Sequence, residues 1–306
     1  QKYYQKHQQD ANSEPISEKS FKRVMSELME WQEQRFFNKD VRSKSHLADH
    51  RVKVKVLTKF FWDKLKRNVN EITEDDLEQY RIWRKKQPRK IGSTYTNDQP
   101  VLDKTVHGDF ITLRQAMKLA KRKGWIYDLP LFPKLKIENR YRSWFSLEEY
   151  KKLLYSATKF IRESPDKRIR IMREDLRDYI LMMSHTGCRV EEMLAVTVRD
   201  CTIKRGDGTQ RNDYMLLRVD GKTGRREALG MWGAVRAYTR IVERHKKNPE
   251  DKLFNRNPRW QLAELLKQTP GINTPNLRYD QDGRRRDAVS FRHYFIMARL
   301  LHGKLD

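Results

Sequence analysis

The spacing of apolar side chains is the feature that most limits what this chain can fold into. Over most of its 306 residues, apolar side chains recur at the period of an amphipathic α-helix. Between residues 197 and 230 they alternate with polar ones instead, and Asp220-Gly221 and Thr223-Gly224 supply turns. We therefore expect a mainly helical fold with a small, three-stranded antiparallel sheet.

Helical spacing predicts four helices in the first part of the chain. They cover about residues 18–36, 46–69, a segment that starts at Thr73, and 109–123. The first helix packs either on its own chain or on a second protomer. Thr73 and Asp76 have the spacing of a capping box, and Gly124 fits a helix C-cap. Residues 87–108 are rich in turn-forming residues and are expected to form a loop.

Pro130 and Pro133, followed by a polar stretch, mark a boundary between two domains. The second domain opens at Ser146, which has Glu149 as its capping-box partner. Its further helices are expected near residues 147–161, 176–185, 232–247, 257–268 and 288–302. The predicted organisation is an N-terminal segment (1–45), a helical domain (46–137), a linker (138–145) and an α+β domain (146–306).

Positive charge is spread over both predicted domains. The chain has 66 Lys and Arg against 41 Asp and Glu, a formal net charge of +25. Residues 46–140 carry 22 basic and 12 acidic side chains, and residues 141–306 carry 35 and 22. Basic surfaces on two folded units favour a polyanionic partner such as double-stranded DNA, with an anionic membrane surface as the alternative.

Basic side chains also recur at helical spacing on two predicted helices of the first domain. These candidate DNA-binding residues are Arg51, Lys55 and Lys59 on one helix, and Arg114, Lys118, Lys121 and Arg122 on the other. A basic stripe is ordinarily just a solvated face, but two stripes on neighbouring helices favour contact with a duplex.

The two cysteines, Cys188 and Cys201, form no disulfide framework and fit a reducing compartment. Because there is neither a membrane-length apolar run nor an apolar signal segment, we expect an intracellular, cytoplasmic protein with access to DNA. His46 and His50 have a metal-like spacing, but no Cys or third His lies near them in sequence, so no metal site is expected.

Three short stretches carry candidate chemistry. In the first, His185 to Glu192, a Thr-Gly turn leads into a helix whose first turn presents Arg189 beside Glu192. A guanidinium there can grip a phosphate, although an ordinary surface Arg–Glu pair has the same spacing. In the third, Asp287 to Phe295, a helix presents Arg292 and His293 from its first turn.

The second stretch, Val219 to Arg226, places Lys222 at a hairpin tip. Its Gly-Lys-Thr tripeptide is not a P-loop, because Leu216 stands where a P-loop needs glycine. A lysine at such a tip is ordinarily solvated, and it gains a role only if the tip reaches a scissile phosphate, where its ammonium can protonate a leaving oxygen.

Taken in order, the three stretches resemble the catalytic core of tyrosine recombinases (phage integrases). The resemblance covers about residues 45–306, because TLRQAMKLAKRKGWI resembles the end of that family's core-binding domain and RSWFSLEEYKKLL the start of its catalytic domain. It implies a two-domain DNA clamp that acts as a homo-tetramer on two duplexes. It also implies strand cutting and rejoining through a 3′-phosphotyrosyl link, with no metal or nucleotide cofactor.

The resemblance implies roles position by position. Arg189 matches the first catalytic Arg, Lys222 the hairpin Lys, Arg292 the second Arg, and Glu192 the acidic residue that holds the first Arg box in shape. The family's usual His three residues before the second Arg is Val289 here, and His293 is the candidate substitute.

No tyrosine matches the family's nucleophile, which lies well beyond the second Arg. The chain ends at Asp306, 14 residues after Arg292, and Tyr214, Tyr279 and Tyr294 lie at other positions. We expect the nucleophile to lie beyond Asp306 or to come from another chain.

Two rival interpretations stay open. A type IB topoisomerase shares the Arg, Lys and Tyr chemistry but needs no partner duplex. A DNA-binding regulator with the same fold would have lost activity; Val289 and the unmatched tyrosine favour it, and the intact basic residues of the three stretches argue against it.

Overall fold

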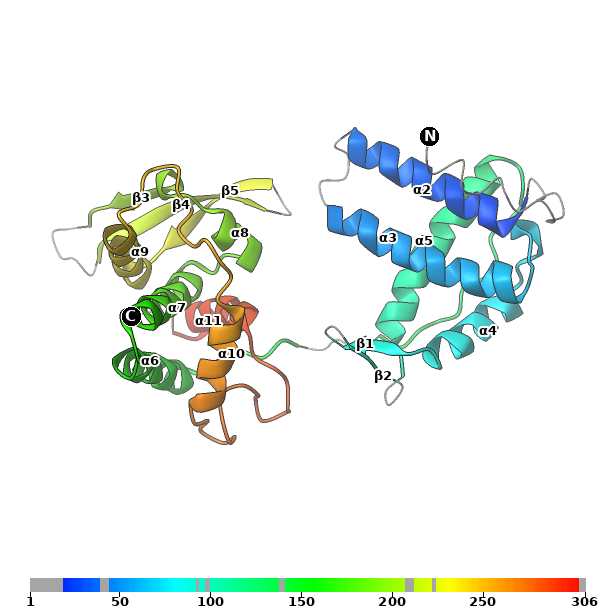
Figure 1. Cartoon of the computed structure of the whole chain (residues 1–306). Helices are drawn as coiled ribbons and strands as arrows, with labels where there is room; N and C mark the ends of the chain where they lie inside the picture. The colour runs from blue at the N-terminus through cyan, green and yellow to red at the C-terminus, as the bar shows by residue number, and fades with distance from the viewer. Residues whose placement is uncertain are drawn as a thin grey trace. The chain divides into compact units, whose positions relative to one another are not determined.

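The computed structural model describes residues 19–38, 44–91, 94–96, 100–137, 141–206, 212–221 and 224–302. The chain divides into two compact units, Gln1–Asn139 and Arg140–Asp306, each with its own hydrophobic core (Figure 1). The described residues are mostly helical, and a three-stranded antiparallel sheet lies in the second unit. The fold class predicted from the apolar spacing is therefore confirmed.

The first unit is a helical bundle with a short hairpin. Its elements are α2 (Phe21–Phe37), α3 (Lys44–Thr58), η1 (Lys59–Lys64), η2 (Val69–Glu71), α4 (Glu74–Lys85), β1 (Arg89–Ile91), β2 (Thr94–Thr96) and α5 (Asp103–Arg122). Helix α2 contacts both α3 and α5. Its side chains Phe21, Val24 and Leu28 are fully buried, so the first predicted helix packs on its own chain.

The second predicted helix is interrupted by a π-helical turn. Helix α3 ends at Thr58, η1 follows, and Lys66 has a φ of 52°, so the helix does not continue to residue 69 as expected. The wider turn lets two consecutive side chains, Phe60 and Phe61, both enter the core with 0% exposure. Both rings contact Tyr80 of α4, at centroid distances of 5.3 and 5.5 Å.

The prediction of a loop over residues 87–108 was wrong at both ends. Strands β1 and β2 form a hairpin within it, and α5 begins at Asp103 rather than Asp109. Asp109 does not open a helix: it is 1% exposed and accepts hydrogen bonds from Tyr80 Oη and Arg84 Nε, each 2.9 Å long. A carboxylate at a core-facing position interrupts the apolar spacing by which a helix is recognised in the sequence. The partners of this one, Tyr80 and Arg84, lie in α4, so the residues around Asp109 do not indicate that it is buried.

The two predicted capping boxes and the predicted glycine cap are present. The capping boxes at Thr73–Asp76 and Ser146–Glu149 form as predicted, with both reciprocal hydrogen bonds present. Gly124 follows α5 with a φ of 71°, the left-handed conformation that ends a helix.

The second unit combines the sheet with six helices in its described residues. Its elements are α6 (Leu147–Arg162), α7 (Lys167–Thr186), α8 (Val190–Ala195), η3 (Val198–Asp200), β3 (Cys201–Lys204), β4 (Tyr214–Gly221), β5 (Gly224–Gly230), α9 (Trp232–His245), α10 (Arg259–Gln268) and α11 (Ala288–His302). Helix α7 is longer than predicted, because Asp166 caps it ahead of a charged first half. The first residues expected in strands, Val196 and Val198, lie instead at the end of α8 and in η3.

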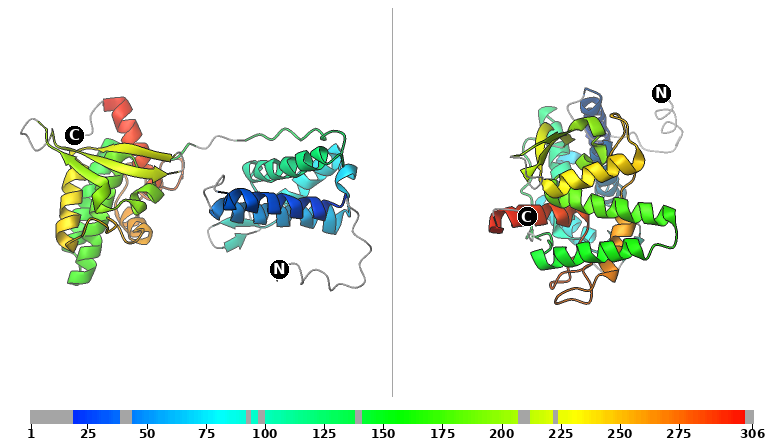
Figure 2. Two further views of the ribbon diagram at one scale, coloured as in Figure 1. Left: turned by 90° about the horizontal axis from the view of Figure 1, so that it is seen from above. Right: turned by 90° about the vertical axis from the view of Figure 1, so that its left-hand side faces the viewer.

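Helix α7 is central to this unit. It contacts α6, α9, α10, α11 and β5. The sheet lies at one end of the unit and α6 at the other (Figures 1 and 2). A buried ion cluster joins α7 to α9: Asp178, 0% exposed, accepts hydrogen bonds from Arg240 Nε at 2.9 Å and from an Arg244 guanidinium nitrogen at 2.6 Å.

We expect Asp178→Ala to lower the free energy of unfolding by about 3–5 kcal/mol, because it removes the shared acceptor of two partly buried guanidiniums. Asp175→Ala is the matched control. Asp175 also pairs with Arg244, but about a third of its side chain is exposed, so we expect a loss near 1 kcal/mol. Urea unfolding followed by circular dichroism measures both, and equal losses would contradict the ranking.

Candidate functional site

The first chemical stretch forms a tight corner between α7 and α8. Gly187 caps α7 in the left-handed conformation, with a φ of 61°. A Cβ on Gly187 would lie 2.8 Å from Cε1 of Phe295 on α11. Both the backbone conformation and the close approach therefore require glycine here, and the corner sits directly against α11.

Arg189 lies two residues later, where it is the N-cap residue of α8. Its backbone N–H donates to Glu192 Oε2 at 2.8 Å, and its guanidinium donates to Glu192 Oε1 at 2.7 Å. The side chain of Arg189 remains one-third exposed while that of Glu192 is buried. The pair predicted from spacing thus forms, and it holds the guanidinium in one orientation at the surface.

Glu192 has a second cationic partner. A guanidinium nitrogen of Arg226, on β5, donates to Glu192 Oε2 at 2.7 Å. Burial raises the pKa of Glu192, but the hydrogen bonds from Arg189 and the charges of Arg226 and Arg189 outweigh it and hold the pKa below its ordinary value. The carboxylate is therefore ionised at neutral pH.

The second stretch forms the predicted hairpin between β4 and β5, in which Gly221 pairs with Gly224. Lys222, at the tip, lies outside the described residues. Its neighbour Gly221 touches the Glu192 side chain so closely that a Cβ would meet Cγ and Cδ at 3.0 Å. The end of the strand that leads to Lys222 is therefore packed on the residue that holds Arg189.

The third stretch reaches the same corner from α11. Arg292, in the first turns of that helix, donates a hydrogen bond from its guanidinium to the Gly187 carbonyl. Gly187 is two residues from Arg189, so one short turn links the two arginines. Both belong to a single compact unit built on one core.

His293 follows Arg292 and is partly buried. Burial lowers the pKa of His293, and the positive charges of Arg142 and Arg292 lower it further, against an opposing effect of Asp287. The imidazole is therefore neutral at pH 7. The backbone N–H of Val289 donates to Asp287 Oδ1 at 2.9 Å.

Tyr294 belongs to the core. Its ring is 3% exposed and stacks on Tyr150 at a centroid distance of 4.3 Å. Burial raises the pKa of Tyr294 to about 12. Its hydroxyl is therefore a packing element rather than an accessible nucleophile.

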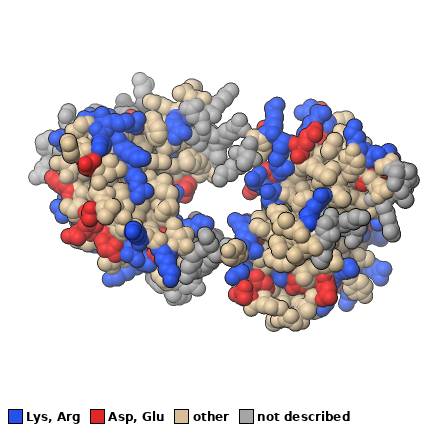
Figure 3. All heavy atoms as spheres, turned by 180° about the vertical axis from the view of Figure 1, so that it is seen from behind, with Lys and Arg blue, Asp and Glu red and all other residues tan. Residues whose placement is uncertain are grey.

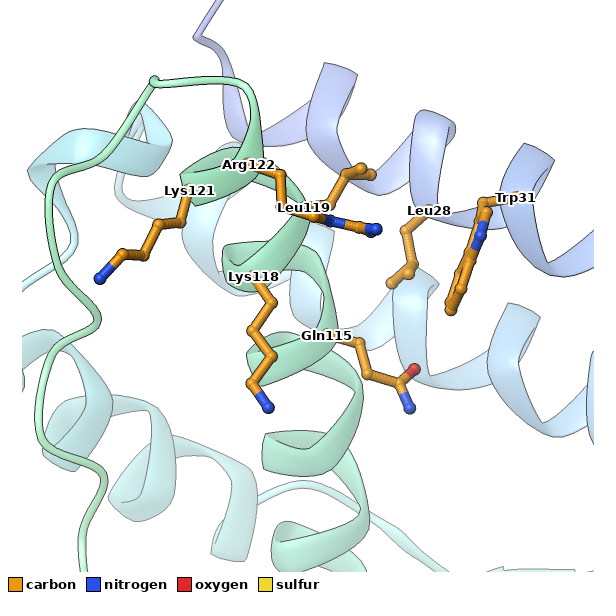
Figure 4. Close-up of a pocket in the computed structure, with 7 residues that line it drawn as sticks. All are labelled: Leu28, Trp31, Gln115, Lys118, Leu119, Lys121 and Arg122. Atoms are coloured by element: carbon orange, nitrogen blue, oxygen red, sulfur yellow. The ribbon is translucent and has the colours of Figure 1, made fainter.

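Three of the four candidate DNA-binding residues of α5, Lys118, Lys121 and Arg122, line a groove of about 530 Å³ on the first unit (Figure 4). Leu28 and Trp31 of α2 line its other side. The exposed side chain of Arg122 extends toward Leu28, whereas that of Lys121 points away from α2. Lys121 also pairs with Asp128 at 2.6 Å.

The other candidates of this group are arranged differently. The guanidinium of Arg114 lies 4.2 Å from the centre of the Phe132 ring, so it packs on its own unit. On α3, Arg51 pairs with Glu33 at 2.8 Å, and Lys55 and Lys59 are exposed. On the face drawn in Figure 3, Lys and Arg side chains lie on both units, with Asp and Glu side chains among them.

The described part of the chain has neither a metal-binding cluster nor a membrane-length apolar helix. Among those residues no group of three His, Cys, Asp or Glu could hold a metal ion, and the rings of His46 and His50 simply contact edge to face at 4.5 Å. No described helix has the length and apolar character needed to cross a membrane.

The ionisation of Glu192 gives a pH-dependent prediction. Because its pKa is lowered on folding, its ionised form stabilises the protein above the unfolded value of about 4.3, and this is lost as the pH falls through the folded value. We expect Glu192→Gln to unfold at a lower temperature than the unmodified protein at pH 7, with the difference shrinking below about pH 4. The exposed neighbour Glu191, changed to Gln, is the control; a pH-independent difference for Glu192→Gln would contradict the prediction.

No family model matches the sequence, and no curated protein matches it either. Solved structures, however, have a similar fold, and the similarity covers most of this chain and most of each solved chain. The XerH site-specific recombinase, bound to a palindromic difH substrate in a post-cleavage complex, has a TM-score of 0.60 at 16% identity, covering 94% of this chain and 88% of that one. The Tn1549 transposon integrase, in complex with a circular intermediate DNA, has a TM-score of 0.60 at 15% identity, covering 91% of this chain and 87% of that one. The chain therefore has the fold of the site-specific tyrosine recombinases.

Proposed function

We propose that this chain is a site-specific DNA recombinase that cuts and rejoins strands through a 3′-phosphotyrosyl intermediate. The observation that carries the proposal is that Arg292 bonds the carbonyl of Gly187, two residues before Arg189, whose guanidinium is held by a buried carboxylate. Two arginines fixed beside one turn form a binding site for the two non-bridging oxygens of a phosphodiester. The fold neighbours XerH and Tn1549 integrase, whose solved structures contain DNA, support the same assignment.

In the proposed reaction a tyrosine hydroxyl, with an ordinary pKa near 10, attacks the phosphorus atom. A bond forms between the tyrosine oxygen and phosphorus, and the bond from phosphorus to the 5′ oxygen breaks. Arg189 and Arg292 stabilise the negative charge that develops on the non-bridging oxygens. Lys222 donates a proton to the departing 5′ oxygen, and the neutral His293 is the candidate to accept the tyrosine proton in place of the histidine that Val289 replaces.

Rejoining is the reverse of cleavage with a different strand. The 5′ hydroxyl of a partner strand attacks the phosphotyrosyl link and releases the tyrosine. Because the energy of the broken bond is kept in that link, the reaction needs neither a nucleotide nor a metal ion. Exchange of strands requires two duplexes, and we propose that a homo-tetramer brings them together.

We propose further that the first unit binds the DNA flank through the basic residues of α3 and α5. Lys118, Lys121 and Arg122 are the strongest candidates, because all three are exposed and line the α5 groove (Figure 4). Arg114 is the weakest, because its guanidinium packs on Phe132.

A regulator with this fold is the second candidate function, favoured by Val289. It would bind DNA at specific sites and form no covalent link. A type IB topoisomerase would instead relax a supercoiled plasmid as a monomer, with no second site present.

Substitution of the groove cations should reduce the salt dependence of DNA binding. The slope of log K against log salt is negative. We expect the triple change Lys118→Ala, Lys121→Ala and Arg122→Ala to make it shallower by about 2–3, since each lost phosphate contact removes about 0.9 from its magnitude. Lys104→Ala, at the other end of α5, is the control. Titrations between about 50 and 200 mM salt measure the slope. An unchanged slope in the triple variant would show that these residues do not contact the backbone.

Substitution of either arginine should stop cleavage and leave binding nearly intact. In the intact protein, we expect Arg189→Ala or Arg292→Ala to slow single-turnover cleavage about a hundredfold to a thousandfold, because each is one of very few donors aimed at the developing charge. For binding, each is one of many phosphate contacts, so affinity at the same salt should change little. Lysine at either position should recover little, because a point charge cannot replace the bidentate guanidinium.

The assay uses a nicked suicide substrate and denaturing gels that resolve the covalent adduct. Cleavage at the unmodified rate by both variants would overturn the assignment of the site. Binding without any adduct from the unmodified protein would favour the regulator.

A further inference from the structure

Arg226 occupies a position that strand alternation reserves for apolar residues. On β5, Ala228 and Gly230 face the interior and are buried, while Arg225, Glu227 and Leu229 face outward and are exposed. Arg226 belongs to the inward-facing set, and it pairs across the hairpin with the buried Val219. An arginine on an inward face must have an anionic partner, because an unpaired charge there is strongly unfavourable.

That partner is Glu192, which Arg226 shares with Arg189. Oε1 of Glu192 accepts from the Arg189 guanidinium at 2.7 Å, and Oε2 accepts from the Arg226 guanidinium at 2.7 Å. One buried carboxylate therefore connects the first turn of α8 to the strand that leaves the hairpin tip. About a third of the Arg226 side chain is exposed, so its fixed orientation comes from this bond rather than from complete burial.

The strand that enters the tip is positioned by the same side chain. Gly221 of β4 packs directly on Glu192, and a Cβ there would collide with it. Both strands of the hairpin therefore contact Glu192 at inward-facing positions near the tip, one by close packing and one by an ion pair. Lys222 is the next residue after Gly221.

We propose that Arg226 is a positioning residue that fixes the end of the hairpin, where Gly221 pairs with Gly224, relative to Arg189, and that Lys222 depends on this position to protonate the leaving oxygen of a phosphate bound at Arg189. This inference rests on the proposed strand-cleavage function. Without Arg226, the end of the hairpin would lose its ion pair to Glu192 and keep the close packing of Gly221 and the strand ladder. Glu192 would keep Arg189 as its ion partner, so the phosphate-binding arginine would stay in place while the tip loosened.

A first experiment measures the tip directly and requires no cleavage. We expect Arg226→Ala to increase amide hydrogen exchange in the residues that flank the tip, Val219 to Gly221 and Gly224 to Arg226, by about tenfold or more. Arg225→Ala is the matched control, because that side chain is 90% exposed and faces outward. Exchange in Arg226→Ala that equals the control would overturn the proposal whether or not the protein cuts DNA.

A second experiment tests what the tip does. In the intact protein we expect Arg226→Ala to slow single-turnover cleavage about tenfold to a hundredfold, with DNA affinity at the same salt unchanged. A substrate with sulfur at the bridging 5′ position should restore the rate, because a thiolate departs without a proton. The double variant Lys222→Ala, Arg226→Ala should be no slower than Lys222→Ala alone, since the two residues act in one step.

The alternatives give different results. If sulfur restores neither Arg226→Ala nor Arg189→Ala, Arg226 contacts the phosphate itself and the positioning role is wrong. If Arg226→Ala lowers the unfolding temperature sharply, the test uses Arg226→Lys instead. That variant keeps the charge and one hydrogen bond, and we expect the sulfur substrate to restore its cleavage rate as well. If the unmodified protein forms no adduct, the proposed function fails, and hydrogen exchange alone decides whether Arg226 holds the tip.

Discussion

The buried carboxylate of Glu192 is the interaction on which the candidate site depends. A lone carboxylate in that position would be strongly disfavoured, so its three donors, the backbone amide and guanidinium of Arg189 and the guanidinium of Arg226, stabilise the folded unit. The same bonds orient Arg189 at the surface before any ligand arrives. Under the proposed function, a phosphate would meet a guanidinium whose conformational freedom has already been lost in folding, and preorganised donors of this kind lower a reaction barrier.

Sequence patterns predicted the elements whose causes are local. Capping boxes depend on residues three positions apart, and the left-handed glycines depend on their own φ, so Ser146 with Glu149, Gly124 and Gly187 could be assigned before any contact was known. The pairing of Arg189 with Glu192 belongs to the same class. Likewise, the turn dipeptides between residues 219 and 224 predicted a hairpin and excluded a P-loop.

Features with causes elsewhere in the chain could not be predicted in this way. In the sequence, Asp109 resembles the first residue of a helix. In the structure it is a core residue, because Arg84 and Tyr80 of α4 donate hydrogen bonds to it. The π-helical turn exists because two adjacent phenylalanines both pack inside. The role of Arg226 could not be predicted, because β5 mixes polar and apolar residues and its sequence does not show which face packs inward. A charged residue at an inward-facing position of the strand was the only clue in the sequence.

The sharing of Glu192 ties the history of this site to the stability of its fold. A catalytic side chain that has no structural role can be replaced by mutation once the activity is lost, because the stability of the fold does not depend on it. Here the replacement of Arg189 would remove one of three donors to the buried Glu192 carboxylate and lower the stability of the unit. A descendant that only bound DNA would therefore face selection to keep its arginines for folding alone. An arginine at position 189 would therefore persist for a structural reason even where the proposed chemistry had been lost.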